Sequence, residues 1–86
     1  MKMDALCEFY AAKGVKLTTR ELPGDSEDMA KLVLIEGDKD ALKFLGEMIL
    51  SVAESKEEGN FSMSPSGPGS IFFSKGSGYG FYINKT

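Results

Sequence analysis

Few side chains in this sequence could do chemistry, and their types and spacing do not assemble a catalytic site. Histidine is absent, which removes the commonest general base and the commonest metal ligand. Cys7 is the single cysteine, so no histidine base can activate its thiol and no second thiol can pair with it. The serines, including Ser51 and Ser77, lack a base for the same reason. We therefore predict that the protein is not an enzyme, with no catalytic residue and no cofactor.

Two other patterns are candidates for binding chemistry. Asp25, Glu27 and Asp28 lie close together, but no twelve-residue calcium loop with a trailing glutamate surrounds them. Residues 75–82 combine a lysine, glycines and aromatic residues as an RNA-binding signature does. Within that segment, however, small residues stand where the signature needs an aromatic and an aliphatic side chain. We predict neither a metal site nor nucleic-acid binding.

Charge is distributed unevenly along the chain. The net charge is −3 over 86 residues, but residues 25–58 hold ten acidic and four basic side chains, a net charge of −6. An acidic segment repels nucleic-acid phosphates and favours a basic partner. The alternative interpretation is a solvated face that keeps a small protein soluble.

The clearest element is a helix over residues 38–56, which Asp38 would cap and Gly59 would end. At about 100° per residue, seven side chains fall on the predicted buried face: Ala41, Leu42, Leu45, Met48, Ile49, Val52 and Ala53. The predicted partner-binding face lies outside it and consists of Asp40, Lys43, Glu47, Leu50 and Glu54. Leu50 is either an apolar anchor within an acidic rim or an isolated exposed leucine.

The remaining elements are shorter. Residues 15–21 alternate in polarity, as expected for a half-buried strand, and a loop over residues 23–29 joins them to the next run. Residues 31–36 are apolar on both faces, which predicts a central strand. Strands near residues 61–63, 71–73 and 79–83 would form an antiparallel meander, with Gly80 marking a bulge or a close backbone approach.

Residues 3–13 fit both helical and strand spacing, and Gly14 favours the helix. The chain should thus be one domain over residues 1–86. Its predicted class is α+β, a mostly antiparallel sheet of about five strands with the long helix on one face. No apolar run approaches the roughly 20 residues of a membrane span. No signal peptide is evident, so we expect a cytoplasmic protein.

Residues 32–42, a short strand followed by Gly37-Asp38-Lys39 opening an amphipathic helix, resemble bacterial immunity protein family thirty-two. The resemblance covers residues 30–86, although Phe61, Ser62 and Met63 stand where family members often carry histidines. It implies a protein that binds a cognate toxin, here a basic toxin domain, and neutralises it by occlusion. Alternative hypotheses are an interaction or scaffold module, including a homodimer formed through an exposed sheet edge, and a small-ligand binder between helix and sheet.

Overall fold

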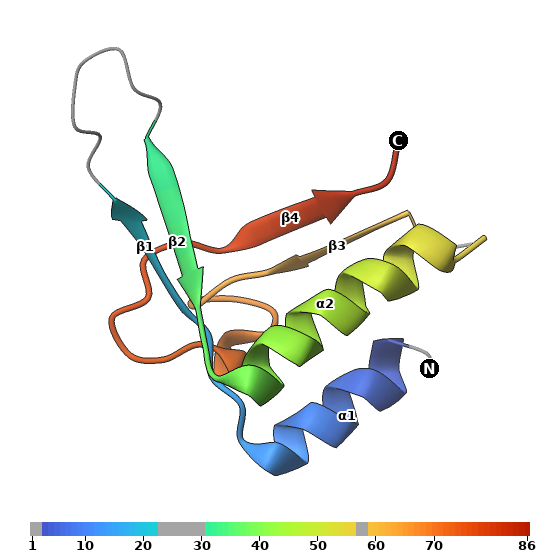
Figure 1. The fold of residues 1–86 in the computed structure, drawn as a ribbon, viewed down its shortest axis with the longest axis horizontal. Coiled ribbons are helices and arrows are strands. Elements are labelled where there is room, and N and C mark those ends of the chain that lie inside the picture. Colours follow the sequence, from blue (N-terminus) through green and yellow to red (C-terminus); the bar gives the residue numbers. More distant parts are fainter. Residues whose placement is uncertain (1–2, 23–30, 57–58) are drawn as a thin grey trace.

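The computed structural model describes residues 3–22, 31–56 and 59–86, which form two helices and two β-hairpins (Figure 1). In chain order the elements are α1 (Met3–Lys13), β1 (Thr18–Leu22), β2 (Leu32–Glu36), α2 (Lys39–Glu54), β3 (Asn60–Met63), the 3-10 helix η1 (Ser70–Phe72) and β4 (Phe81–Asn84). The N-terminal helix is confirmed. No helix in these ranges is long and apolar enough to cross a membrane.

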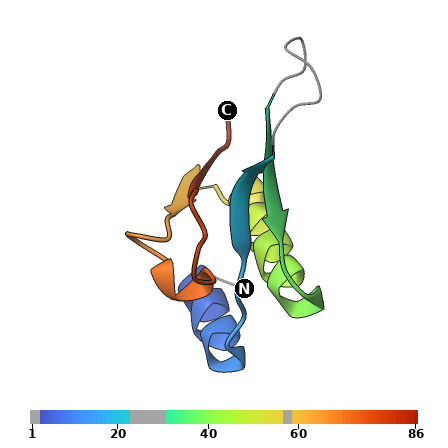
Figure 2. The same ribbon diagram turned by 90° about the vertical axis from the view of Figure 1, so that its left-hand side faces the viewer.

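The described strands form two separate two-stranded sheets, so the prediction of one sheet of about five strands is wrong. β1 pairs antiparallel with β2, and β3 pairs antiparallel with β4. One isolated parallel bridge, between Leu17 and Phe73, joins the two hairpins. Figure 2 shows β3 and β4 on one side of the molecule and β1 and β2 on the other.

The predicted strand at residues 71–73 is instead η1 and the residue that follows it. In a strand, Phe72 and Phe73 would point to opposite faces, yet both side chains are buried. A helical turn that begins after Gly69, at φ +80°, directs both rings inward. Phe72 lies 4.5 Å from Phe44 and Phe73 lies 5.8 Å from Phe81, measured between ring centroids. Burial of two consecutive aromatic rings therefore outweighs the extended pattern.

Both ends of α2 follow from local chemistry. The Asp38 Oδ1 accepts a hydrogen bond from the Ala41 N–H at 2.8 Å, which confirms the predicted cap. The helix ends at Glu54, because Ser55 is already extended and its N–H donates back to the Ser51 carbonyl. The prediction that Gly59 ends the helix is thus wrong.

The buried side of α2 is rotated from the predicted arc toward Phe44. This ring is fully buried, between Tyr10 of α1 at 5.0 Å and Phe72 at 4.5 Å. An aromatic ring has more apolar surface to remove from water than a leucine, so the helix turns Phe44 inward and Leu42 outward. The core residues are Leu6, Tyr10, Val15, Leu17, Thr19, Ala41, Phe44, Met48, Val52, Met63, Phe72 and Phe73.

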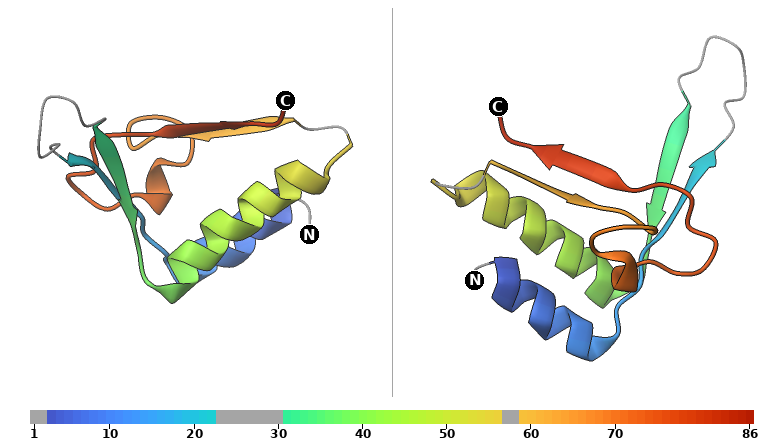
Figure 3. Two further views of the ribbon diagram at one scale, coloured as in Figure 1. Left: turned by 45° about the horizontal axis from the view of Figure 1, so that its top comes forward. Right: turned by 180° about the vertical axis from the view of Figure 1, so that it is seen from behind.

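The final strand begins at Phe81, later than predicted, because Tyr79 is held by β1. The Thr19 Oγ1 donates to the Tyr79 carbonyl and accepts from the Tyr79 N–H at 3.2 Å. Gly80 then passes so close to β3 that a Cβ there would lie 2.9 Å from the Ser64 Cα. The predicted close backbone approach is confirmed. Figure 3 shows from two sides that β3 and β4 run alongside the helices while the β1–β2 hairpin projects away from them.

Candidate protein-binding surface

The structure divides the predicted partner-binding residues of α2 into two groups. Lys43, Leu50 and Glu54 are exposed. Asp40 is half-buried and Glu47 is exposed, and both lie beside α1. The Lys13 Nζ lies 4.0 Å from the Asp40 Oδ2, and Glu47 hydrogen-bonds to Tyr10.

The pKa of the Tyr10 hydroxyl on α1 reflects the carboxylates of α2 that lie beside it. Desolvation, the hydrogen bond to Glu47 and the charges of Glu47 and Asp40 all raise the pKa of the Tyr10 hydroxyl, since each disfavours a phenolate. Glu47 is nevertheless exposed, and the Asp40 side chain is 47% exposed, so both carboxylates lie near α1 and still contribute to the surface of α2.

A second apolar face lies on the exposed side of α2. We call it the outer face, and its members are Leu42, Gly46, Ile49, Leu50 and Ala53. Leu42 is 47% exposed, Ile49 39% and Leu50 58%. Their spacing puts them on one helix face. Leu50 is therefore not an isolated exposed leucine.

Sequence reasoning missed the outer face because it assigned Leu42, Ile49 and Ala53 to the core. A signal was present: at about 100° per residue, Leu42 and Phe44 lie on nearly opposite sides of the helix. Only one of these two side chains could point to the core. A helix that is apolar on both sides normally has both sides covered.

Gly46 lies within the outer face and has no packing role among the described residues. A Cβ placed on it would meet no atom within 4 Å. Glycine within a helix costs roughly 0.5–1 kcal/mol relative to alanine, and nothing in the described part of the chain requires its missing side chain. The missing side chain leaves the backbone of α2 open at this position.

The β2 strand presents further exposed apolar side chains. Val33 is 53% exposed and Ile35 37%, and Leu32 is also exposed. The prediction of a central strand is wrong, because β2 is an edge strand that pairs with β1 alone in the part of the chain that the structure describes. The composition of residues 32–36 is that of a covered strand, but among the described residues Leu32, Val33 and Ile35 stay exposed.

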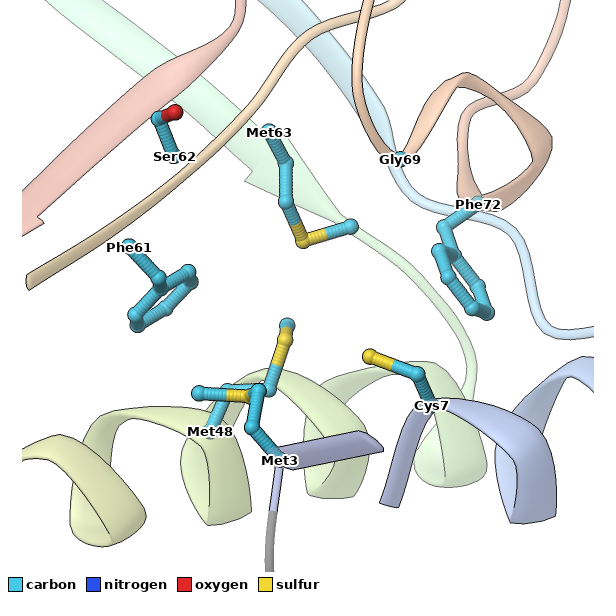
Figure 4. Close-up of a pocket in the computed structure, with 8 residues that line it drawn as sticks. All are labelled: Met3, Cys7, Met48, Phe61, Ser62, Met63, Gly69 and Phe72. Carbon is cyan, nitrogen blue, oxygen red and sulfur yellow. The ribbon is translucent and has the colours of Figure 1, made fainter. Parts of the chain in front are cut away.

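A cavity of about 210 Å³ lies between the helices, β3 and η1. Figure 4 shows the thioethers of Met3, Met48 and Met63 and the thiol of Cys7 directed into it. Burial, with a smaller effect from Asp4, raises the pKa of the Cys7 thiol, which keeps it protonated and weakly nucleophilic. The cavity wall is almost wholly apolar, so its chemistry is that of a hydrophobic pocket.

Elsewhere, the Glu21 carboxylate pairs with Tyr79 and Lys31. The Tyr79 hydroxyl donates to the Glu21 Oε2 at 2.6 Å, and the Lys31 Nζ lies 3.2 Å from the Glu21 Oε1. These two partners lower the pKa of the Glu21 carboxyl. Among the described residues, no group of three or more cysteine, aspartate or glutamate side chains could hold a metal ion. The carboxylates of residues 25, 27 and 28 lie outside those residues.

Comparisons of the chain with protein-family models, with curated proteins and with solved structures found no match. The candidate surface is therefore defined by its geometry alone.

Proposed function

We propose that this chain is a protein-binding domain that acts without catalysis, and that its partner binds the outer face of α2. One observation carries the proposal. A single helix buries one apolar side in the core and exposes a second that includes Leu42, Ile49 and Leu50. Exposed apolar side chains that are contiguous and bordered by charge are typical of protein interfaces. Lys43 and Glu54 supply that border.

The partner we propose to test first is a toxin domain. Its support is the sequence resemblance of residues 30–86 to immunity proteins. The outer face suggests that apolar contact contributes to binding, since its three large side chains are exposed. Leu50, the most exposed of the three large side chains, is the natural central anchor.

Site-specific photocrosslinking in the source cell tests the surface directly. A photoreactive phenylalanine analogue replaces Leu50 or Leu42 on α2, and replaces Ile71 or Tyr82 in the matched controls. Ile71 and Tyr82 are 60% and 63% exposed, so the controls match in exposure but lie on η1 and β4. We expect one protein to crosslink at Leu50 and Leu42 and to be absent from the controls. Equal crosslinking at all four positions would contradict the proposal.

A second candidate function, binding of a small apolar molecule, draws on the cavity beside Cys7. A cavity of about 210 Å³ could hold a compact hydrophobic ligand. A screen of such ligands should raise the melting temperature, and Cys7→Phe, which fills the space, should abolish the rise. An unchanged melting temperature across the screen would exclude this function.

A further inference from the structure

We propose that β2 pairs with β2 of a second copy of this chain across a two-fold axis, so that the two β1–β2 hairpins form one continuous antiparallel sheet. This interface is separate from the outer face of α2 and does not depend on the function proposed above. Its evidence is the direction of the backbone hydrogen-bonding groups of β2, the register that symmetry allows, and the side chains that would meet.

The backbone groups of Val33 and Ile35 point toward the open edge of β2. Thr19 fixes this direction, because its N–H donates to the Ser77 Oγ at 3.2 Å and its carbonyl accepts from the Gly78 N–H at 3.0 Å. Both groups of Thr19 therefore point away from β2. Residues directly opposite in an antiparallel pair share this orientation, and Ile35 is opposite Thr19. Val33, two residues along, is oriented as Ile35 is.

Symmetry restricts the register, and full overlap of the two strands selects one. A two-fold axis perpendicular to a sheet keeps each side chain on its own face, so an antiparallel self-pairing must bring odd-numbered residues opposite odd-numbered ones. Pairing the whole of β2 with its copy satisfies this condition. Leu34 then lies at the axis, and Val33 is opposite the Ile35 of the other copy. The outward N–H and carbonyl groups of both residues gain partners, while the hydrogen bonds between β1 and β2 stay intact.

The side chains in this register suit one another. Two β-branched residues meet on one face and Leu34 meets its own copy on the other, and such apolar cross-strand pairs stabilise a sheet. Glu36 falls opposite Leu32, so no like charges are opposed. A second copy thus pairs the open edge of β2 and places apolar side chains beside those of β2 on both faces.

The edge also lacks the usual protection against pairing. Edge strands of monomeric proteins commonly carry lysine, proline or a bulge, and residues 32–36 contain no lysine or proline. The outer edge of β1, by contrast, is covered within the chain. Leu17 exchanges hydrogen bonds with Phe72 and Ser74, and Thr19 with Ser77 and Gly78.

The surface area that the two copies would bury sets the expected strength of dimerisation. Stable dimers bury about 1,200–2,000 Å² in total, and a strand of five residues contributes less than that by itself. We expect a reversible dimer that forms in the micromolar range and above.

Analytical ultracentrifugation of the full chain over a concentration series tests the proposal. The expected mass rises with concentration from 9.3 kDa to twice that value. Val33→Lys should hold the mass at the monomer value, and the matched control Tyr82→Lys, on exposed β4, should dimerise as the parent does. A parent that stays monomeric to millimolar concentration, or a Val33→Lys protein that dimerises normally, would overturn the proposal.

A second measurement separates this dimer from any other. In a mixture of labelled and unlabelled protein, isotope-filtered NMR should show contacts between Val33 of one copy and Ile35 of the other. Val33→Pro should remove both the contacts and the dimer without unfolding the hairpin, because the N–H it deletes points away from β1. A dimer without the Val33–Ile35 contacts would contradict the register.

Discussion

Replacing Gly46 with alanine should stabilise the isolated protein. The magnitude follows from two terms. Alanine is better than glycine within a helix by about 0.5–1 kcal/mol, and the added methyl group meets no atom within 4 Å among the described residues, so no steric cost offsets the gain. We expect the free energy of unfolding to rise by about 0.5–1 kcal/mol. For a domain of this size, that corresponds to a melting temperature roughly 2–8 °C higher.

The matched control is the same substitution at Gly80. There the new Cβ would lie 2.9 Å from the Ser64 Cα and closer still to the Met63 carbonyl oxygen. Backbone cannot yield as a flexible side chain can, so Gly80→Ala should lower the free energy of unfolding by about 1–3 kcal/mol. Urea denaturation followed by circular dichroism measures both variants.

For the reasoning to hold, Gly46→Ala must raise the free energy of unfolding and Gly80→Ala must lower it. A Gly46→Ala protein that is less stable than the parent would show that the outer face of α2 is packed against something within the protein, and would refute it as a free surface. If the partner approaches the α2 backbone at Gly46, the stabilised variant should also give less photocrosslinking at Leu50. Stability and binding would then change in opposite directions.

Three further results are expected. Asp38→Ala should lower the free energy of unfolding by about 1 kcal/mol, and Asp38→Asn by much less, because an amide oxygen can also cap the helix; chemical denaturation distinguishes them. Phe44→Ala should cost about 3–5 kcal/mol, and an unchanged melting temperature would contradict its central place in the core. The Glu21 carboxyl should titrate by NMR below its ordinary pKa, and Tyr79→Phe should bring it back toward that value. Since the folded-state pKa is lowered, the stabilisation from Glu21 is present at neutral pH and is lost as the pH falls through the folded-state pKa.

Much of the secondary structure could be predicted, because local sequence specifies it. The Asp38 cap and the periodic apolar residues of α2, and the helical spacing before Gly14, depend on chemistry within a few residues. The antiparallel pairing of β1 with β2 followed from two neighbouring extended segments, and the predicted loop over residues 23–29 lies outside the described residues. The close approach at Gly80 could also be inferred, since a glycine within a strand has few other uses.

The candidate surface could be predicted only in part. Leu50, Lys43 and Glu54 were placed outside the core correctly, because polar neighbours mark that side of the helix. Asp40 and Glu47, which are also predicted to bind a partner, lie beside Lys13 and Tyr10 of α1. The sequence pattern of residues 38–56 does not indicate that α1 packs beside the side of α2 that carries Asp40 and Glu47.

The sequence by itself determined where the helices begin, which segments are extended, and that histidine-dependent chemistry is absent. Only the tertiary structure decided that Phe44 and not Leu42 faces the core, that a helical turn ending at Phe72 replaces a strand, and that the strands divide into two hairpins with β2 at an edge. The physical reason is that these outcomes depend on competition between distant segments for a limited buried volume. Each apolar segment favours burial, but in a chain of 86 residues not every apolar face can be covered. The faces that the core leaves exposed, on α2 and on β2, are those through which we expect this protein to bind others.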